Sequence, residues 1–547
     1  MDALRRAAPV LAAAAAGAAL FVWIAGARLI DPREVGWAMR LDWQWHFLGW
    51  HMFRHEPWQF PPARVAGEFY PIGTSIAYTD SLPLAALLLK PWSKWLPDPL
   101  QYLGAWLVMC YALQGACGAI VAGCVTPRAP PRLLTGVMLA TSPVLLDRVG
   151  HVALCSHFLI LLAFWLYGRR WMGGAGARII SWSALVTVSA FIHPYLWLMI
   201  LVLSGAAVVR YAVVDHAYSL RGALGHVGAA AACSGVSAWL LGWFIIGEGP
   251  DLGAQGLGVY SMNLLGMFAS NGMSTFFGRV PVFAEQTYEG LNYLGAGAFA
   301  LVAIAAVMLI RRPLSRETLR ALAPLAAACG ALALVSLSPR ITMGQAVLVD
   351  VPVPHGVASV WSIFRATGRL FWPAGYLLTA GAAVIVVARA RHEVAAIVLA
   401  AAVAIQLVDL HGRYTQDRAA RSDAAFYEWT DLTRNAGLMR AASSRRHVVV
   451  LPTLVCGAEP VPYAPLLAFA GSSGLTVNTG YAARVDVSRL REACARDMAA
   501  ARAGDLRRDT LYIVSPDLAA QLKAAAREPV TCGPLLGAFH CAIDASP

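Results

Sequence analysis

The sequence predicts a mostly helical membrane protein of several spans that ends in a small α/β domain. Of its 547 residues, 58% are hydrophobic and only 14% are charged, with a mean hydropathy of +0.58. Soluble globular proteins carry about 25% charged residues. After about residue 411 the hydropathy falls, and short strand-like and helix-like runs follow one another. We therefore expect a transmembrane domain over residues 1–410 and an α/β domain over residues 411–547.

Eleven apolar runs of about 15 to 25 residues are the expected transmembrane helices, some of them short for a bilayer. The first run follows Arg5 and Arg6 and is interpreted as an uncleaved signal anchor, because further spans follow it. The segment Leu82–Leu96 contains two prolines and two lysines, so we interpret it as a helix lying at the membrane interface. The eleven runs lie near residues 9–30, 101–125, 133–147, 152–168, 179–192, 195–213, 226–246, 291–310, 321–338, 370–388 and 394–410.

Arginines in the short loops set the expected orientation, because basic residues near span ends favour the cytoplasm. Under the eleven-span count the basic loops fall on the same side as the N-terminus, which we place in the cytoplasm of a bacterial cell with the spans in its inner membrane. The net charge of +12 is spread over these loops, so it does not indicate nucleic-acid binding. The periplasmic side then receives the first loop, about 31–100, the loops 247–290 and 339–369, and the C-terminal domain.

The C-terminal domain is expected to contain strands and helices of ordinary length. It also holds four cysteines, an even number that favours two disulfides in an oxidising periplasm, with three pairings open. Buried free thiols are the alternative. The strands are expected over His447–Leu451, Thr510–Val514 and Phe539–Ile543, the helices over Ser488–Ala503 and Asp517–Arg527, and the cysteines are Cys456, Cys494, Cys532 and Cys541.

The stretch Leu41–Pro62 is dense in acidic, histidine and tryptophan residues. If it is helical, its spacing places Asp42, His46, Gly49, Trp50 and Phe53 on one face. A carboxylate at a dry rim holds a proton more tightly than one in water, so Asp42 is the candidate general base, with His46 as its support. The structural interpretation is that Asp42 caps or orients the loop. The alternative candidates for the general base are Glu68 and Asp80, of which Asp80 ends the run FYPIGTSIAYTD.

A second polar segment, SPVLLDRVGHVALCSH, joins the third and fourth expected spans. Its Asp147, Arg148, His151 and His157 are candidates to hold a sugar or phosphate, or to support the base. Divalent metal binding is an alternative, which we do not favour because no tight HxxxD or HExxH arrangement appears. The plain interpretation is that Arg148 reaches toward the interface.

A third polar segment, SIFRATGRLFWP, carries Arg365 and Arg369 four residues apart. We expect both on one helical face, where two guanidinium groups suit a lipid phosphate. Ordinary anionic headgroups are the alternative ligands. Arg340 could join the pair from the far end of the same loop, and the 247–290 loop, with Glu285 and Glu289, is expected to be a mobile cover for the substrate.

This layout resembles the GT-C superfamily of membrane glycosyltransferases over about residues 5–410. The likeness rests on Asp42 after the first span, a long first loop with a YP-x-G element (Tyr70, Pro71 and Gly73), a polar turn after the third span, and a C-terminal domain. The FRATGR run is similar to sequences in bacterial GT-C-like proteins. The chain departs from the family where Trp43 follows Asp42 in place of a second acid, where Arg148 follows Asp147, and where the WWD motif of oligosaccharyltransferases is absent.

The resemblance implies an inverting glycosyltransferase without a required metal, using a polyprenyl-phosphate-linked sugar and an envelope glycan, lipid or protein acceptor. It implies that the first-loop carboxylate is the base and that arginines of later loops bind the lipid-linked donor. A transporter of a lipid-linked saccharide is one alternative, although such proteins place charges near mid-membrane and often show repeats. A noncatalytic scaffold for envelope assembly is the other.

Overall fold

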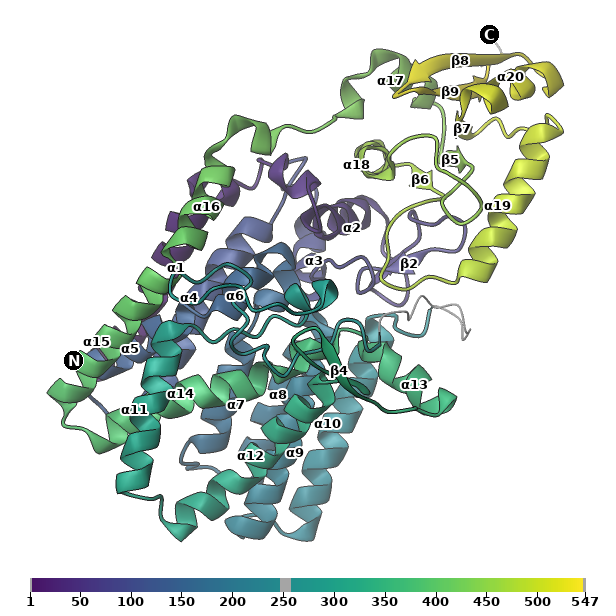
Figure 1. Ribbon diagram of the computed structural model, residues 1–547. Coiled ribbons are helices and arrows are strands. Elements are labelled where there is room, and N and C mark those ends of the chain that lie inside the picture. The colour runs from purple at the N-terminus through teal and green to yellow at the C-terminus, as the bar shows by residue number, and fades with distance from the viewer. Residues whose placement is uncertain (1, 246–256, 545–547) are drawn as a thin grey trace. The chain divides into compact units, whose positions relative to one another are not determined.

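The computed structural model describes residues 2–245 and 257–544, most of them in helices (Figure 1). It divides into two compact units, each made of separate stretches of chain. The helical unit consists of Met1–Ile30, Gly104–Ser237 and Ala254–Asp423, and the mixed unit of Asp31–Leu103, Ala238–Gly253 and Ala424–Pro547. The expected division at residue 410 therefore differs from the structure, because the first loop belongs to the same unit as the C-terminal strands.

The helical unit is a bundle in which α1 packs against α5 and α16, α11 against α14 and α15, and α12 against α9 and α14. Figure 1 shows α8, α9 and α12 running side by side. The helices are α1 (Asp2–Ala25), α4 (Leu103–Ala122), α5 (Ala129–Ala140), α6 (Pro143–Asp147), α7 (Phe158–Gly168), α8 (Ala175–Ile192), α9 (Pro194–Val209), α10 (Leu220–Leu240), α11 (Ala296–Arg311), α12 (Arg316–Ser336), α13 (His355–Trp361), α14 (Trp372–Arg389), α15 (His392–Asp409) and α16 (His411–Ser422), and a hairpin pairs β3 (Arg340–Met343) with β4 (Ala346–Asp350).

Each of the eleven predicted apolar runs coincides with a helix, but eleven spans are not confirmed. In the described part of the chain, eight helices are long and apolar enough to cross a membrane, and nine if the bent pair Ala129–Ala140 and Pro143–Gly150 counts as one span. The remaining two runs correspond to the shorter apolar helices Val152–Gly168 and Ala296–Arg311. Both are shorter than the roughly 20 residues that a straight span needs, so the described residues support eight or nine spans and leave eleven as a prediction.

Glycines allow α1, α4 and α5 to approach closely. A Cβ on Gly115 of α4 would lie 2.3 Å from the carbonyl oxygen of Ala13 in α1, and a Cβ on Gly136 of α5 would lie 2.4 Å from the Gly115 carbonyl oxygen. Small residues at such crossings let helix backbones come close together. In a membrane, where exclusion of water does not drive helices together, this close packing is what holds them to one another.

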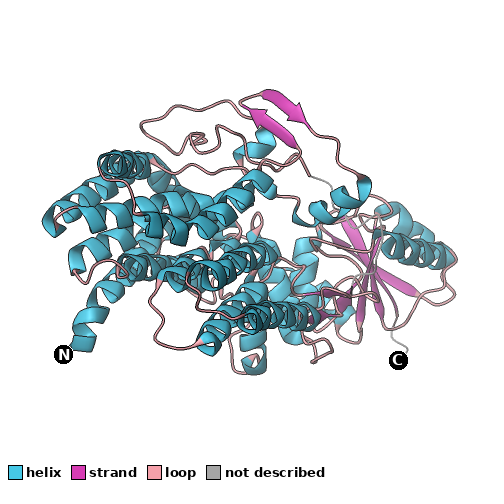
Figure 2. Cartoon of the chain, turned by 90° about the horizontal axis from the view of Figure 1, so that it is seen from below, coloured by secondary structure: helices cyan, strands magenta, loops and turns pink. Residues whose placement is uncertain are grey.

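The mixed unit is built on a five-stranded sheet with the order β6-β5-β7-β9-β8. The strands β6, β5 and β7 run parallel, and β9 and β8 complete the sheet as antiparallel partners; Figure 2 shows them as a twisted fan. Its strands are β5 (His447–Leu451), β6 (Thr476–Val477), β7 (Thr510–Val514), β8 (Val530–Leu535) and β9 (Ala538–Ile543), and its helices are α2 (Trp43–His55), α3 (Pro83–Leu89), α17 (Ala436–Ala442), α18 (Tyr463–Ser472), α19 (Val487–Arg502) and α20 (Pro516–Ala525), with a short ladder of β1 (Arg64–Val65) and β2 (Thr74–Ser75).

All five predicted elements of the C-terminal domain are present, to within two residues at each end. The strands β6 and β8 and the helices α17 and α18 were not predicted. The strand β6 has only two residues, and β8 contains Gly533 and Pro534, which weaken a strand pattern. The core under the sheet includes Val449, Leu451, Tyr512, Val514, Leu518, Leu522 and Cys541.

The first loop extends the sheet of the mixed unit beyond β6. Glu68 forms a parallel bridge with Val477, the Val477 amide donates to the Gly67 carbonyl at 2.7 Å, and the Tyr70 amide donates to the Val477 carbonyl at 2.9 Å. The Tyr70 ring stacks on His447 with 4.4 Å between centroids. The YP-x-G element thus anchors the first loop to the sheet.

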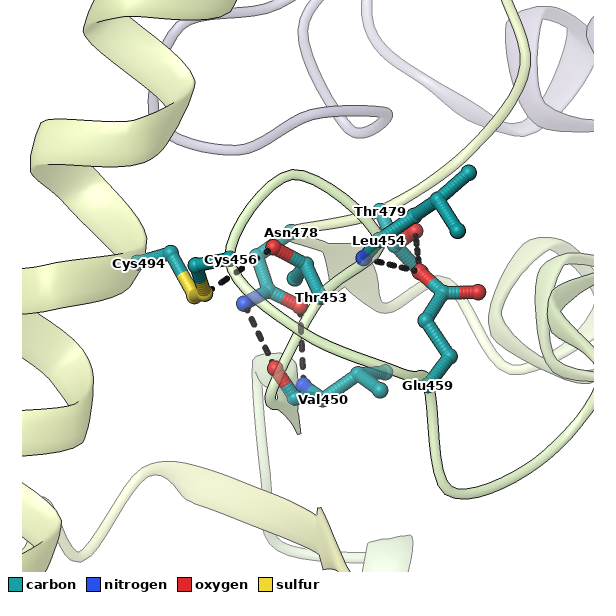
Figure 3. Close-up of a disulfide and its surroundings, with 8 residues drawn as sticks. All are labelled: Val450, Thr453, Leu454, Cys456, Glu459, Asn478, Thr479 and Cys494. Carbon is teal, nitrogen blue, oxygen red and sulfur yellow. Dashed lines mark hydrogen bonds between the residues drawn. A yellow bond between two sulfur atoms is a disulfide. The ribbon is translucent and has the colours of Figure 1, made fainter.

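Two disulfides join the four cysteines of this unit, as predicted, and settle the pairing that the sequence left open: Cys456–Cys494 and Cys532–Cys541. Figure 3 shows the first of them linking the segment after β5 to α19. Beside it, the Asn478 side chain accepts from the Val450 amide at 2.8 Å and donates to the Val450 carbonyl at 3.1 Å. This segment is therefore fixed covalently and by hydrogen bonds.

Candidate functional site

The residues predicted to be functional fall into both units. Three of them, Asp42, His46 and Asp80, belong to the mixed unit. The others, Asp147, Arg148, His151, Arg340, Arg365 and Arg369, belong to the helical unit. Each group is described within its own unit.

Asp42 is the residue that immediately precedes α2, and it is half-buried. Its carbonyl oxygen accepts from the Trp45 amide at 3.2 Å, which begins the helix. The rest of the predicted face, His46, Gly49, Trp50 and Phe53, is buried. The predicted helix is present, and Asp42 lies at its N-terminal end. Burial covers most of α2 and is not confined to the predicted face, since Phe47, Leu48 and His51 are buried as well.

A turn that contains Asp80 packs on the buried face of α2. Ser81 donates from Oγ to the His46 carbonyl at 2.7 Å. A Cβ on Gly49 would lie 2.1 Å from Thr79 Oγ1 and 2.6 Å from Ser81 Oγ, so only glycine fits there. Asp80 has a φ of +58°, in the left-handed region that side chains seldom adopt. The helix that follows Asp42 and the turn that carries Asp80 are thus held together.

Glu68, another candidate carboxylate of the first loop, is fully buried within the mixed unit. Its Oε1 accepts from the Tyr481 amide at 2.9 Å, and burial raises the pKa of Glu68 to about 8. At neutral pH this group is therefore mostly a protonated acid, and it cannot accept a proton from a substrate. Nearby, Trp45 of α2 stacks between Tyr463 and Tyr481, with centroid distances of 5.1 and 4.6 Å.

In the helical unit a buried carboxylate, Glu289, gathers several of the predicted residues into one network. Arg148 donates from Nη1 to Glu289 at 2.9 Å, and its Nη2 pairs with Asp147. Arg369 donates from Nε to Glu289 at 2.7 Å and also from Nη2. His151 Nε2 lies 3.7 Å from Glu289 Oε1. We call Asp147, Arg148, His151, Glu289 and Arg369 the Glu289 cluster.

The Glu289 cluster balances its own charge, with two carboxylates facing two guanidinium groups. Burial alone would raise the pKa of Glu289, but the charge of Arg369, the hydrogen bond from His151 and the charge of Arg148 hold it well below its usual value. Buried charges are stable only when paired in this way. The carboxylate is therefore ionised over the whole physiological range, and the segments that carry it are locked together.

The prediction that Arg365 and Arg369 share one helical face is wrong. Residues 362–371 form two short 3-10 turns, Ser362–Phe364 and Thr367–Phe371, separated at Ala366, whose ψ of 65° is not helical. The break is held by the Tyr195 hydroxyl, which accepts from the Ala366 amide at 2.7 Å. Arg369 nevertheless lies 4.8 Å over the Tyr195 ring, whereas Arg365 lies just before the break and is half-buried.

The remaining predicted residues have other surroundings. Arg340 is exposed on β3, with its guanidinium 5.6 Å from the centre of the Phe283 ring; it does not join the Glu289 cluster. His157, from the same polar turn as His151, is buried, and its Nδ1 lies 2.8 Å from the Tyr376 hydroxyl. The polar turn therefore sends its two histidines to different partners.

The loop that was expected to be a mobile cover is partly outside the described residues, at 246–256. From residue 257 onward it is anchored: Asn263 Nδ2 donates to Gln286 at 2.9 Å, and Gln286 Nε2 donates to Thr342 Oγ1 at 2.9 Å. Glu289 adds the ion pairs of its cluster. Glu289 was predicted only as a member of this loop, and its pairing with Arg148 and Arg369 was not predicted. The signal for that pairing is that two buried arginines require a buried acid.

Two family models match separate parts of the chain. A family model described as Domain of unknown function (DUF6311) matches residues 14–411. A second model, described as the DUF6311 C-terminal domain, matches residues 438–543. No curated protein matches the sequence.

Proposed function

The chain belongs to the DUF6311 family, and we propose that it is an inverting membrane glycosyltransferase of the GT-C type. It would move a sugar from a polyprenyl-phosphate-linked donor to an envelope glycan, lipid or protein acceptor at the periplasmic face of the inner membrane. One observation carries the proposal: Asp42 is a half-buried carboxylate at the start of a helix whose other predicted face residues are buried. A general base needs such a fixed, partly dry position that a substrate can still reach.

In the proposed reaction, an acceptor hydroxyl gives its proton to the Asp42 carboxylate while its oxygen attacks the anomeric carbon of the donor sugar. The bond between that carbon and the phosphate oxygen breaks, and the phosphate leaves with the electron pair. A single displacement inverts the anomeric configuration. His46 supports the helix from its buried face, where its carbonyl accepts from Ser81. The phosphate is already an anion, so it needs electrostatic stabilisation more than a proton.

Arg365 is the proposed residue for the donor phosphate. The fork of Arg369 is already occupied by Glu289 through two nitrogen atoms, so a phosphate would have to displace that carboxylate. Arg365 is half-buried on the same polar segment, so part of the residue is open to a phosphate. The proposed role of the Glu289 cluster is then to position the segments near the donor without binding it directly; its members here are Arg148, Arg369, Asp147 and His151. Arg340 is a further cation on the same loop as Arg365.

The test is sugar transfer in membrane vesicles that hold the full chain. The donors are a panel of polyprenyl-phosphate monosaccharides with radiolabelled sugars, and total envelope material supplies the acceptors. We expect transfer from at least one donor, a loss of at least about 100-fold with Asp42→Asn, as for removal of a general base, and wild-type transfer with the exposed control Asp31→Asn. Thermal unfolding of each variant reports whether it is folded.

Two results would overturn the proposal. Transfer at the wild-type rate by folded Asp42→Asn would remove Asp42 as base, and Asp80→Asn would then be the next variant. Absence of transfer from every donor, together with an unchanged envelope glycan profile in a deletion strain, would reject glycosyl transfer itself and leave the transport and scaffold alternatives.

A further inference from the structure

Two histidines and an aspartate converge at the C-terminal end of α2, away from the residues used above. His51 and His55 are one helical turn apart, and Asp98 lies in the segment after Lys90–Trp92. One nitrogen of each histidine and one oxygen of Asp98 all lie within 4.8 Å of one another. His55 Nε2 is 3.3 Å from Asp98 Oδ1. His51 is buried, whereas His55 and Asp98 are exposed.

Hydrogen bonds at one ring nitrogen of His51 orient its ring as they do in a metal ligand. Its Nε2 lies 3.2 Å from the Ala468 carbonyl oxygen and 3.0 Å from Ser472 Oγ. A carbonyl can only accept, so Nε2 carries the hydrogen and Nδ1 keeps its lone pair. Metal-binding histidines commonly donate their other N–H to a carbonyl in this way. His51 Nδ1 is buried, and it has no hydrogen-bond partner in the described part of the chain.

The second ring nitrogen of His51 also suits a metal, because the lone pair of an imidazole nitrogen is what binds the ion. A buried ring nitrogen without a hydrogen-bond partner costs free energy unless some ligand uses it.

Asp98 is brought to the histidines by Arg54. The guanidinium donates to the carbonyl oxygens of Pro97 at 2.8 Å and Ser93 at 3.1 Å, which fixes the loop that ends in Asp98. Arg54 Nη1 lies 3.9 Å from Asp98 Oδ1. The position of the carboxylate is therefore set before any ligand arrives.

We propose that His51, His55 and Asp98 form a site for a divalent cation of the zinc class. Two imidazoles and one carboxylate, with a fourth position left for water, are a ligand set that zinc uses, whereas magnesium and calcium prefer oxygen ligands. The ion would tie the end of α2 to the 93–98 loop. This inference is independent of the proposed glycosyl transfer, because none of the three residues has a role in it.

The experiment measures zinc bound by the full chain in detergent, purified without a histidine tag. The protein is dialysed against zinc chloride, and bound metal is determined by elemental analysis. We expect one zinc ion for each wild-type chain, and a loss of at least tenfold in affinity with His55→Ala and with Asp98→Asn. The control is His392→Ala, which removes an exposed histidine whose Nε2 lies 2.9 Å from Glu393 and should leave the zinc content unchanged.

Thermal unfolding with and without zinc chloride shows whether a variant that binds no zinc is nevertheless folded. Zinc should raise the melting temperature of the wild type and of His392→Ala, and should not raise that of the two site variants, whose metal-free melting temperatures should stay near wild type because both side chains are exposed. Absence of zinc uptake by the wild type, equal uptake by His55→Ala, or saturation by magnesium chloride in place of zinc would each overturn the proposal.

Discussion

Arg369 and Glu289, 80 residues apart in the chain, form a two-point ion pair in the interior of the helical unit. Arg148 donates to the same carboxylate from the polar turn after α6. Glu289 therefore joins its own segment to the two segments that carry Arg148 and Arg369. The site residues of the helical unit depend on this pairing for their positions.

Glu289→Gln should destabilise the protein by about 3–5 kcal/mol, because removing one partner of a buried ion pair leaves the Arg369 charge without its carboxylate and Arg148 with Asp147 alone. The measurement is thermal or denaturant unfolding in detergent. The matched control is Glu285→Gln, four residues away on an exposed side chain, where we expect a change within about 0.5 kcal/mol. Equal effects of the two substitutions would show that the Glu289 cluster contributes nothing to stability.

The sequence predicted the residue types of this network better than their arrangement. Asp147, Arg148, His151 and Arg369 were chosen because charges beside apolar runs are costly without partners, and they do share partners. Arg365 was expected on the face of Arg369, and the 3-10 break at Ala366 prevents this. The break depends on the Tyr195 hydroxyl from a distant helix, which no local spacing can reveal.

Glu68→Gln should remove the pH-dependent loss of folding stability that ionisation of Glu68 causes in the mixed unit. The folded pKa of about 8 lies above the ordinary value of 4.5, so the favourable contribution of the protonated acid is complete below pH 4.5 and is lost as the pH rises through about 8. At pH 8 the cost is about 4 kcal/mol, at 1.36 kcal/mol for each pH unit. The variant, which mimics the protonated acid, should match the wild type near pH 4.5 and exceed it at pH 8.

The readout is the difference in melting temperature between Glu68→Gln and the wild type from pH 4.5 to pH 8. Glu428→Gln, at an exposed position of the same unit, should show no such pH-dependent difference. A constant difference for Glu68→Gln across this range would mean that Glu68 is ionised throughout in the folded protein, and would restore it as a candidate base.

The two disulfides should differ in their contribution because they close loops of different length. Cys456–Cys494 spans 38 residues and Cys532–Cys541 spans 9. Chain entropy predicts a stabilisation of about 4 kcal/mol for the longer loop and about 3 kcal/mol for the shorter. Replacing each pair by serines and comparing unfolding under oxidising conditions tests this order; a larger loss for the shorter loop would contradict the entropic account.

The C-terminal elements were predictable because alternating β-branched runs and capped helices are local signals. Ser515, with Pro516 after it, accepts from the Leu518 amide and begins α20, as its sequence indicates. What could not be predicted is that residues 67–70 extend the sheet at β6, since brief contacts between segments about 400 residues apart leave no pattern. The pairing of Asp98 with His51 and His55, and of the four cysteines, depends on how the chain folds back on itself, which local sequence patterns do not show.

Arg365→Ala should weaken binding of a polyprenyl phosphate without unfolding the protein. Arg365 is half-buried. The ion pairs of Glu289 are made by Arg148, His151 and Arg369, so we expect them to persist in the variant. One charge-assisted hydrogen bond contributes about 1.5–3 kcal/mol, which corresponds to about a 10- to 150-fold loss of affinity. Binding of polyprenyl phosphate to the detergent-solubilised chain is the measurement, and Arg391→Ala, at an exposed position in a predicted cytoplasmic loop, is the control. Unchanged affinity in Arg365→Ala would remove this residue from the donor site.

Gly49→Ala should loosen the turn that carries Asp80. The new methyl group would lie 2.1 Å from Thr79 Oγ1 and 2.6 Å from Ser81 Oγ, so either the turn or α2 must move, at a cost of about 1–3 kcal/mol. The control is Gly412→Ala in α16, where a Cβ meets open space and alanine should stabilise the helix by up to about 1 kcal/mol. Because Asp42 precedes α2, the same substitution should also lower sugar transfer if Asp42 is the base. Loss of stability with full transfer would separate the packing of this turn from the chemistry.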